Sequence, residues 1–244
     1  MRKRARSLPQ GQPLEPYSPW RWAAGRIGYI VVVMRYLARL LATLPVLAAV
    51  AFPQAVALPS PESHFGHPMG ADRELIGWDE VVRYFRRLET ESDRIVVDEL
   101  GKTTEGRPFI LATIAAPDTL SDLDRYRAIQ ARLADPRETS QEQAEALIAA
   151  GKAVVLITCS IHSDEVASTH TAVEFAYKLL TEDTPRTRRI LQDTIFLLLP
   201  SLNPDGVDKV AAWYERYVGT PYEGAPMTEI YHKYAGHDNN RDWY

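Results

Sequence analysis

The sequence contains very little cysteine. Cys159 is the only cysteine among 244 residues, so an internal disulfide is excluded. A single cysteine is compatible with export from the cell but does not indicate it. The chain also lacks internal repeats and low-complexity tracts. Its composition, 45% apolar and 25% charged, is that of a globular protein and argues against wholesale disorder.

An excess of positive charge is absent from most of the chain. Residues 1–57 contain eight Lys and Arg against one acid, Glu15, whereas the remaining 187 residues carry a balance of −11 within a formal net charge of −4. An acidic balance of this kind argues against nucleic acid as a partner.

The basic N-terminal part contains no apolar run of membrane-spanning length. Its apolar core, Leu40–Phe52, is shorter than the roughly 20 residues that cross a bilayer. Arg35 and Arg39 precede this core, and Ala55-Val56-Ala57 has the small-x-small pattern of a cleavage site. This order predicts a signal peptide that is cleaved near Ala57, and therefore a secreted or periplasmic protein that meets the membrane only through its export signal.

Two features of the same region leave alternatives open. Met34 would be a more usual start for a signal peptide, which leaves residues 1–33 as a Pro-rich extension. Ile27–Val33 adds further apolar residues, so a membrane anchor is the alternative to cleavage. The predicted organisation is a basic extension with signal peptide (1–57), an extended lead-in rich in Pro and Gly (58–77) and a folded domain (78–244).

The first half of the folded domain shows alternating helix and strand patterns. Apolar residues at helical spacing predict a helix that begins at Trp78. Residues 95–100 and 109–116 are predicted as the two strands of an antiparallel hairpin, because turn residues separate them. A charged surface helix is expected over 123–133. A second helix should begin after the capping box of Ser140 and Gln143 and end at Gly151.

The second half predicts parallel strands. Residues 153–158 and 195–199 are continuous apolar runs, typical of strands buried on both faces, and a helix with an apolar face over 172–180 lies between them. Such a crossover is right-handed with parallel strands. The predicted fold class is α/β, a mixed sheet flanked by helices. Because His162 and Asn203–Gly206 follow the ends of the two strands, we expect a site at that edge of the sheet.

His162 and Glu165 are the candidate metal ligands at this edge. Imidazole nitrogen and carboxylate oxygen both suit zinc, and a spacing of three residues places both side chains on one side of a helical turn. Taken alone, the pattern is weak. A surface histidine beside a glutamate that favours the start of a helix is the simpler interpretation.

Four motifs in order strengthen the metal interpretation. They are KTTEGRPFILATI (102–114), IHSDEVA (161–167), LPSLNPDGVD (199–208) and GHDNNRDW (236–243). Together they resemble the zinc carboxypeptidase family, the metallopeptidases related to carboxypeptidase A, over roughly residues 75–244. Pancreatic members have arginine where this chain has Asp164, so side-chain specificity is not carried over. The resemblance indicates a divergent bacterial branch.

The resemblance implies roles for five residues. His162 and Glu165 match the first two ligands of one Zn²⁺ ion, and Asn240 and Arg241 match the pair that grips the C-terminal carboxylate of the substrate. A guanidinium suits that role because its planar fork binds a carboxylate bidentately. The family also uses an arginine to polarise the scissile carbonyl. Arg216 is the only arginine in the corresponding interval, and a helix-surface charge is an equal alternative for it.

The implied activity is that of a zinc metallocarboxypeptidase, which acts on the C-termini of peptides or proteins. The family's third zinc ligand, its general base glutamate and a capping tyrosine would follow Tyr244. We therefore expect the sheet to be incomplete at the C-terminus, and the 244 residues alone to hold zinc poorly and be inactive. The alternatives are an N-acyl amino acid deacylase related to aspartoacylase, which the EGRP and Asn-Pro-Asp-Gly stretches disfavour, and a non-catalytic secreted binding domain.

Overall fold

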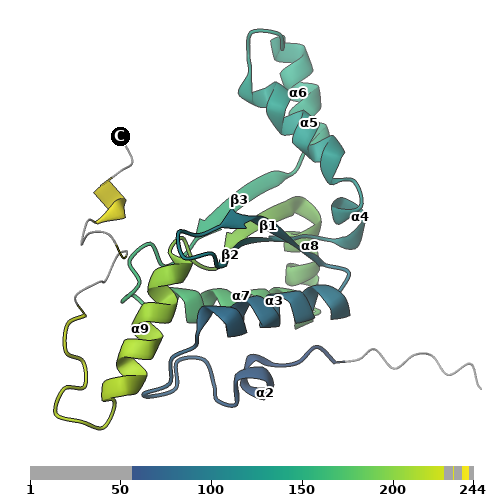
Figure 1. Ribbon diagram of the computed structural model, residues 1–244. Helices are drawn as coiled ribbons and strands as arrows, with labels where there is room; N and C mark the ends of the chain where they lie inside the picture. The colour runs from purple at the N-terminus through teal and green to yellow at the C-terminus, as the bar shows by residue number, and fades with distance from the viewer. Residues whose placement is uncertain (1–56, 228–232, 234–237, 242–244) are drawn as a thin grey trace, which may run out of the picture. The chain divides into compact units, whose positions relative to one another are not determined.

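The computed structural model describes residues 57–227, 233 and 238–241. Its elements, shown in Figure 1, are α2 (Pro61–Phe65), α3 (Trp78–Glu91), β1 (Ile95–Lys102), β2 (Pro108–Ile114), α4 (Pro117–Leu120), α5 (Leu123–Ala134), α6 (Gln141–Ala150), β3 (Ala153–Thr158), α7 (Ala167–Thr181), α8 (Pro185–Asp193), β4 (Thr194–Leu199), α9 (Pro204–Tyr217) and the 3₁₀ turn η1 (Asn239–Arg241).

The strands form one mixed sheet. Their order is β1-β2-β4-β3, with antiparallel pairing of β1 with β2 and of β2 with β4, and parallel pairing of β3 with β4. The predicted hairpin and the predicted parallel pair are therefore both confirmed. Helices flank this sheet, so the α/β fold class is confirmed as well (Figure 1).

The core lies between the sheet and two helices, α3 and α7, which contact each other beneath it (Figure 1). Helix α3 is amphipathic as predicted, and it buries Trp78, Val81, Phe85 and Leu88. It also buries Tyr84, whose hydroxyl donates to the carbonyl of Pro59, 2.9 Å away. That bond satisfies a buried polar group, which explains how a tyrosine enters the apolar face.

One prediction about the sheet is wrong. Strand β3 was expected to be buried on both faces, but most of its residues are exposed, including Leu156 at 60%. The reason is its position. Within the described residues β3 pairs only with β4, at the edge of the sheet, whereas the core helices pack beneath the other strands. An apolar β-branched sequence thus identified a strand but not its place in the sheet.

The helix boundaries follow the sequence closely. Ser140 and Gln143 form both bonds of the predicted capping box, and α6 ends at Ala150 with Gly151 as its C-cap. The lead-in 58–77 is not extended throughout, since it contains α2, which Ser60 caps. No helix in the ranges that the structure describes is long and apolar enough to cross a membrane. The predicted signal peptide up to Val56 lies outside these ranges and stays a prediction.

Candidate functional site

The carboxyl ends of β3 and β4 meet, as the order of strand and loop predicted. The backbone N–H of Cys159 donates to Leu199 O (3.0 Å), and the N–H of Leu202 donates to Cys159 O (2.7 Å). These bonds continue the pairing of the strands into the two loops. The loop that carries His162 and the start of α9 are therefore held against each other.

Gly206 allows the closest approach between these loops. It lies in the first turn of α9 and does not have a left-handed φ. A Cβ at this position would lie 2.4 Å from Ser163 Cβ. The absence of a side chain, and not an unusual backbone angle, is what the fold requires here.

A strained turn begins the loop after β3. Ser160 has a φ of 46°, which is uncommon for a residue other than glycine. Its hydroxyl lies 2.7 Å from the hydroxyls of both Ser168 and Thr169, and the Ser168 hydroxyl also accepts from the Ser160 N–H. Thr169 in turn donates to Pro200 O (2.9 Å) at the end of β4. Strained residues of this kind concentrate at functional sites, where the surrounding bonds hold them.

His162 lies between two carboxylates. Its Nδ1 is 3.1 Å from Glu165 Oε1, and its Nε2 is 2.9 Å from Asp238 Oδ1. The hydrogen bonds to Glu165 and then to Asp238 raise the pKa of His162 above its ordinary value. The structure thus brings together the two predicted metal ligands and adds a third residue, Asp238, that the sequence interpretation did not assign.

Asp238 connects His162 and Glu165 to Asn240 and Arg241, the predicted binding residues for the substrate carboxylate, which we name the carboxylate clamp. Its Oδ1 also accepts from the Asn240 N–H (2.9 Å), and its Oδ2 pairs with Arg241 Nη2 (3.2 Å). Partial desolvation raises the pKa of Asp238, but the hydrogen bonds from His162 and the Asn240 N–H outweigh it and leave that pKa lowered. We name His162, Glu165, Asp238 and Arg241 the His162 cluster.

The His162 cluster fits two positions of a zinc site. Two ligands of a tetrahedral zinc, each ~2.0–2.2 Å from the metal, lie roughly 3.3 Å apart, close to the observed separation of 3.1 Å between Nδ1 and Oε1. With Nε2 bonded to Asp238, the lone pair of Nδ1 is left to face the metal. Among the residues that the structure describes, no group of three or more His, Cys, Asp or Glu could hold an ion, so these two ligands have no third partner there.

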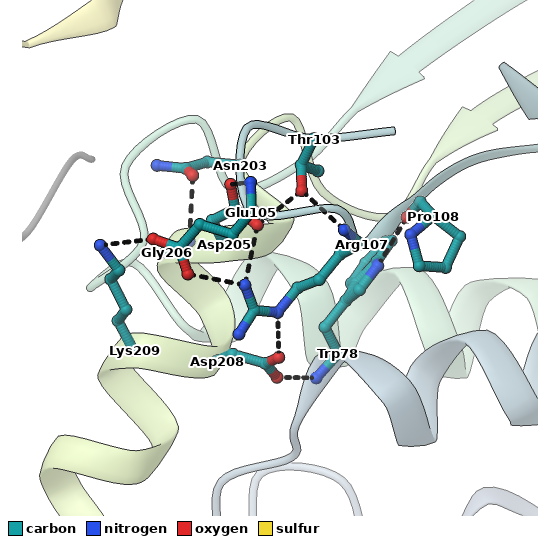
Figure 2. Close-up of polar contacts among 10 residues, drawn as sticks. All are labelled: Trp78, Thr103, Glu105, Arg107, Pro108, Asn203, Asp205, Gly206, Asp208 and Lys209. Atoms are coloured by element: carbon teal, nitrogen blue, oxygen red, sulfur yellow. Dashed lines mark hydrogen bonds and ion pairs between the residues drawn. The ribbon is translucent and has the colours of Figure 1, made fainter. Parts of the chain in front are cut away.

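A second polar cluster joins the β1–β2 turn to α9 (Figure 2). Asp205 accepts from Thr103 Oγ1 (2.6 Å), Glu105 N (3.1 Å) and Arg107 Nη1 (2.9 Å). Arg107 Nε also pairs with Asp208, which accepts from the N–H of Trp78 at the start of α3 (2.6 Å). We name Thr103, Glu105, Arg107, Asp205, Asp208 and Lys209 the hairpin–α9 cluster.

Hydrogen bonding fixes the charges of the hairpin–α9 cluster. Burial lowers the pKa of Arg107, but bonds to Glu105, Asp208 and Asp205 outweigh it and raise that pKa. Glu105 also pairs with Lys209 (2.9 Å), and this bond and the one to Arg107 lower the pKa of Glu105. Two of the four motifs noted in the sequence, EGRP and Asn-Pro-Asp-Gly, therefore meet in one salt-bridge network.

Arg216 is not brought to His162. It is exposed in the last turn of α9, about 15 Å along the helix axis from Gly206 at a rise of ~1.5 Å per residue. The alternative of a helix-surface charge fits this position, and a role in carbonyl polarisation stays a prediction. His170 is buried in α7, and burial lowers its pKa.

Sequence reasoning missed Asp238 and the Ser160 turn for different reasons. A carboxylate partner such as Asp238 could have been expected, because a histidine that binds a metal commonly donates its other ring N–H to a carboxylate. The Ser160 turn had none, since its partners lie eight and nine residues away with no characteristic motif.

Three of the solved structures that are similar to this one are as follows. They are thrombin-activatable fibrinolysis inhibitor (13% identity, 64% of this chain, 33% of that chain, TM-score 0.42), carboxypeptidase A from Helicoverpa armigera (21%, 55%, 26%, 0.38) and putative carboxypeptidase A from Shewanella denitrificans OS-217 (16%, 60%, 32%, 0.35). Structural similarity at these TM-scores is too low to support an inference about function. The chain covers a third or less of the length of each.

The sequence comparison with family models identifies the family of this chain. No curated protein matches the chain. The family model of zinc carboxypeptidase, however, matches residues 81–244, about two thirds of the chain and all of its sheet and candidate site. The chain therefore belongs to the zinc carboxypeptidase family.

Proposed function

We propose that this chain contributes to a zinc metallocarboxypeptidase that hydrolyses the C-terminal peptide bond of peptides or proteins. One observation carries the proposal. The Nδ1 of His162 and Oε1 of Glu165 face each other at 3.1 Å, while Nε2 is bonded to Asp238. The family match supports the same chemistry.

In this proposal His162 and Glu165 hold one Zn²⁺, and Asp238 positions the imidazole. By accepting from Nε2–H, Asp238 selects the tautomer whose Nδ1 is unprotonated and fixes the ring plane. When bound, zinc supplies Lewis acidity and lowers the pKa of water. The chain's own contribution is a nitrogen and an oxygen donor held in place before the metal arrives.

Arg241 and Asn240 bind the C-terminal carboxylate of the substrate. Arg241 is 66% exposed and uses Nη2 on Asp238, so its guanidinium has further donors to offer to a substrate carboxylate. Asp238 contacts both Arg241 and His162, so a single residue links the carboxylate clamp to the proposed zinc ligands. A substrate held by its terminal carboxylate would have only its last peptide bond beside His162 and Glu165, the residues that would hold the zinc, which is the basis of exopeptidase selectivity.

The proposal is tested by comparing free and amidated peptides. In full-length protein that contains this chain, Arg241→Ala should lower kcat/KM for peptides with a free C-terminus by on the order of 30- to 1000-fold, which corresponds to ~2–4 kcal/mol for a charge-assisted bidentate contact. Any cleavage of C-terminally amidated peptides should stay unchanged. Arg137→Ala, at an exposed arginine on another surface, is the matched control.

The metal is measured in the same preparations. The wild-type protein should contain about one zinc per chain, and His162→Ala should lose both zinc and activity. Equal losses on free and amidated peptides would assign Arg241 another role. Cleavage of N-acyl amino acids instead of peptides would favour the deacylase, and peptide binding without zinc or hydrolysis would favour a binding domain.

A further inference from the structure

A pocket beside the His162 loop is not used by the proposed reaction. Its volume is about 560 Å³, and it lies between α9, the segment Ala71–Leu75 and the chain that follows α9. Aromatic and acidic side chains share its wall, among them Trp213, Tyr217, Asp164 and Glu74. We name it the acidic-aromatic pocket.

The aromatic wall is built in advance of any ligand. Trp213 Nε1 donates to Ala225 O (2.9 Å), and the rings of Trp213 and Tyr217 lie 4.7 Å apart. Tyr214 donates to Glu223 (3.0 Å), which also accepts from the N–H of Gly219 (2.8 Å). These bonds hold the chain after α9 against the helix, so binding in the pocket does not have to order its wall.

The charges in the wall favour a cation. Arg73 is the only basic residue among the described residues of the lining, and its guanidinium is paired with Glu223 (3.1 Å). The carboxylates of Asp164 and Glu74 therefore set the sign of the potential. Carboxylates and aromatic rings in one wall form an environment in which lysine and arginine side chains gain cation–π and Coulomb attraction together.

The position of the pocket indicates which part of a peptide enters it. Asp238 and Arg241 lie on the Nε2 side of His162, whereas Glu165 lies on the Nδ1 side. Asp164 and Val166, which flank Glu165 in sequence, line the pocket. If Arg241 holds the C-terminal carboxylate, the chain that crosses the imidazole toward Glu165 runs in the N-terminal direction of the substrate.

We propose that the acidic-aromatic pocket binds a lysine or arginine side chain of the peptide substrate, N-terminal to the scissile bond. The inference rests on the proposed function and adds to it a substrate class. Preference for the C-terminal residue itself is a separate property. The enzyme should select peptides whose basic residue precedes the residue that is released.

The test uses peptides that differ by one charge. Each pair is identical except for lysine or norleucine at one of the three positions before the C-terminal residue. At one of these positions, wild-type full-length protein should cleave the lysine peptide with a kcat/KM about tenfold higher, since lysine alone gains the cation–π and carboxylate contacts. Asp164→Asn and, separately, Trp213→Ala should remove most of that ratio. Asp124→Asn, at an exposed carboxylate on α5, should leave it unchanged.

Binding to zinc-stripped protein separates this inference from the proposed function. Calorimetric titration should show the lysine peptide binding more tightly than its norleucine partner, and Asp164→Asn should abolish the difference. Equal binding and cleavage of the two peptides, or a preference that survives both variants, would refute the pocket assignment while peptide hydrolysis stands. Loss of the binding difference in Asp164→Asn in a protein that hydrolyses no peptide would refute the hydrolase and retain the pocket.

Discussion

The hairpin–α9 cluster and the His162 cluster both bring carboxylates together with basic side chains, but they differ in how completely their members are bonded. Asp205 is only 7% exposed, and both of its oxygens accept bonds from the turn between β1 and β2. In the His162 cluster each ring nitrogen meets one carboxylate, and Glu165 is 61% exposed. Charged groups that are buried and fully hydrogen-bonded stabilise the fold, whereas charged groups that are partly exposed to solvent can bind a ligand.

The largest expected effect on stability comes from removing Arg107, the central cation of the hairpin–α9 cluster. Arg107→Ala would leave Asp205 and Asp208 without their shared partner beneath the hairpin. We expect a loss of about 3 kcal/mol in the free energy of unfolding, at the low end of the range for breaking a buried ion pair because Arg107 is partly exposed. Urea denaturation should show a lower midpoint with an unchanged slope.

The matched control for this prediction is Arg137→Ala. Arg137 also pairs with a carboxylate, Asp135, but its side chain is 84% exposed. Exposed pairs of this kind contribute little to stability because solvent screens them, so its midpoint should hardly move. Equal effects of the two substitutions would mean that the hairpin–α9 cluster is no more structural than a surface pair.

The sequence predicted these regions unequally. Local signals were sufficient for the capping box at Ser140 and for the amphipathic helix at Trp78, because each depends on neighbours within one or two turns. The exposure of β3 could not be predicted, since the apolar content of a strand does not tell which strand lies at the edge. The bond from His162 to Asp238 spans 76 residues, and only the folded chain shows it.

Gly206 lies at the close contact between the His162 loop and α9, and it gives a prediction of a smaller effect. Gly206→Ala should cost ~1–3 kcal/mol, because the added methyl group would overlap Ser163 Cβ. In an unobstructed helix the same change would stabilise by up to ~1 kcal/mol. The sign of the effect therefore reports the close contact.

A second substitution identifies the contact partner. Ser163→Gly removes the Cβ and Oγ that the new methyl group would meet, so the double variant should recover part of the stability lost by Gly206→Ala, whereas Asn203 Nδ2 would still lie 2.8 Å from that methyl group. The measurement is a double-mutant cycle of urea midpoints. Strictly additive effects of the two substitutions would show that the loops do not touch in solution.

The smallest expected effect concerns the titration of His162 in metal-free protein. The carboxylates of Glu165 and Asp238 raise its pKa above the ordinary value of ~6.5. Since the folded pKa lies above the unfolded one, the protonated ring adds stability that is fully present below pH ~6.5 and is lost as the pH rises through the folded pKa. Asp238→Asn removes one of the two carboxylates, so the pKa of His162 should fall toward the ordinary value but stay above it while Glu165 remains. Histidine-detected NMR titration measures this directly, and His170, whose pKa burial lowers, is the internal reference that should not move. An unchanged His162 pKa in Asp238→Asn would mean that the 2.9 Å contact with Asp238 does not persist in solution, and that the imidazole is not oriented by it.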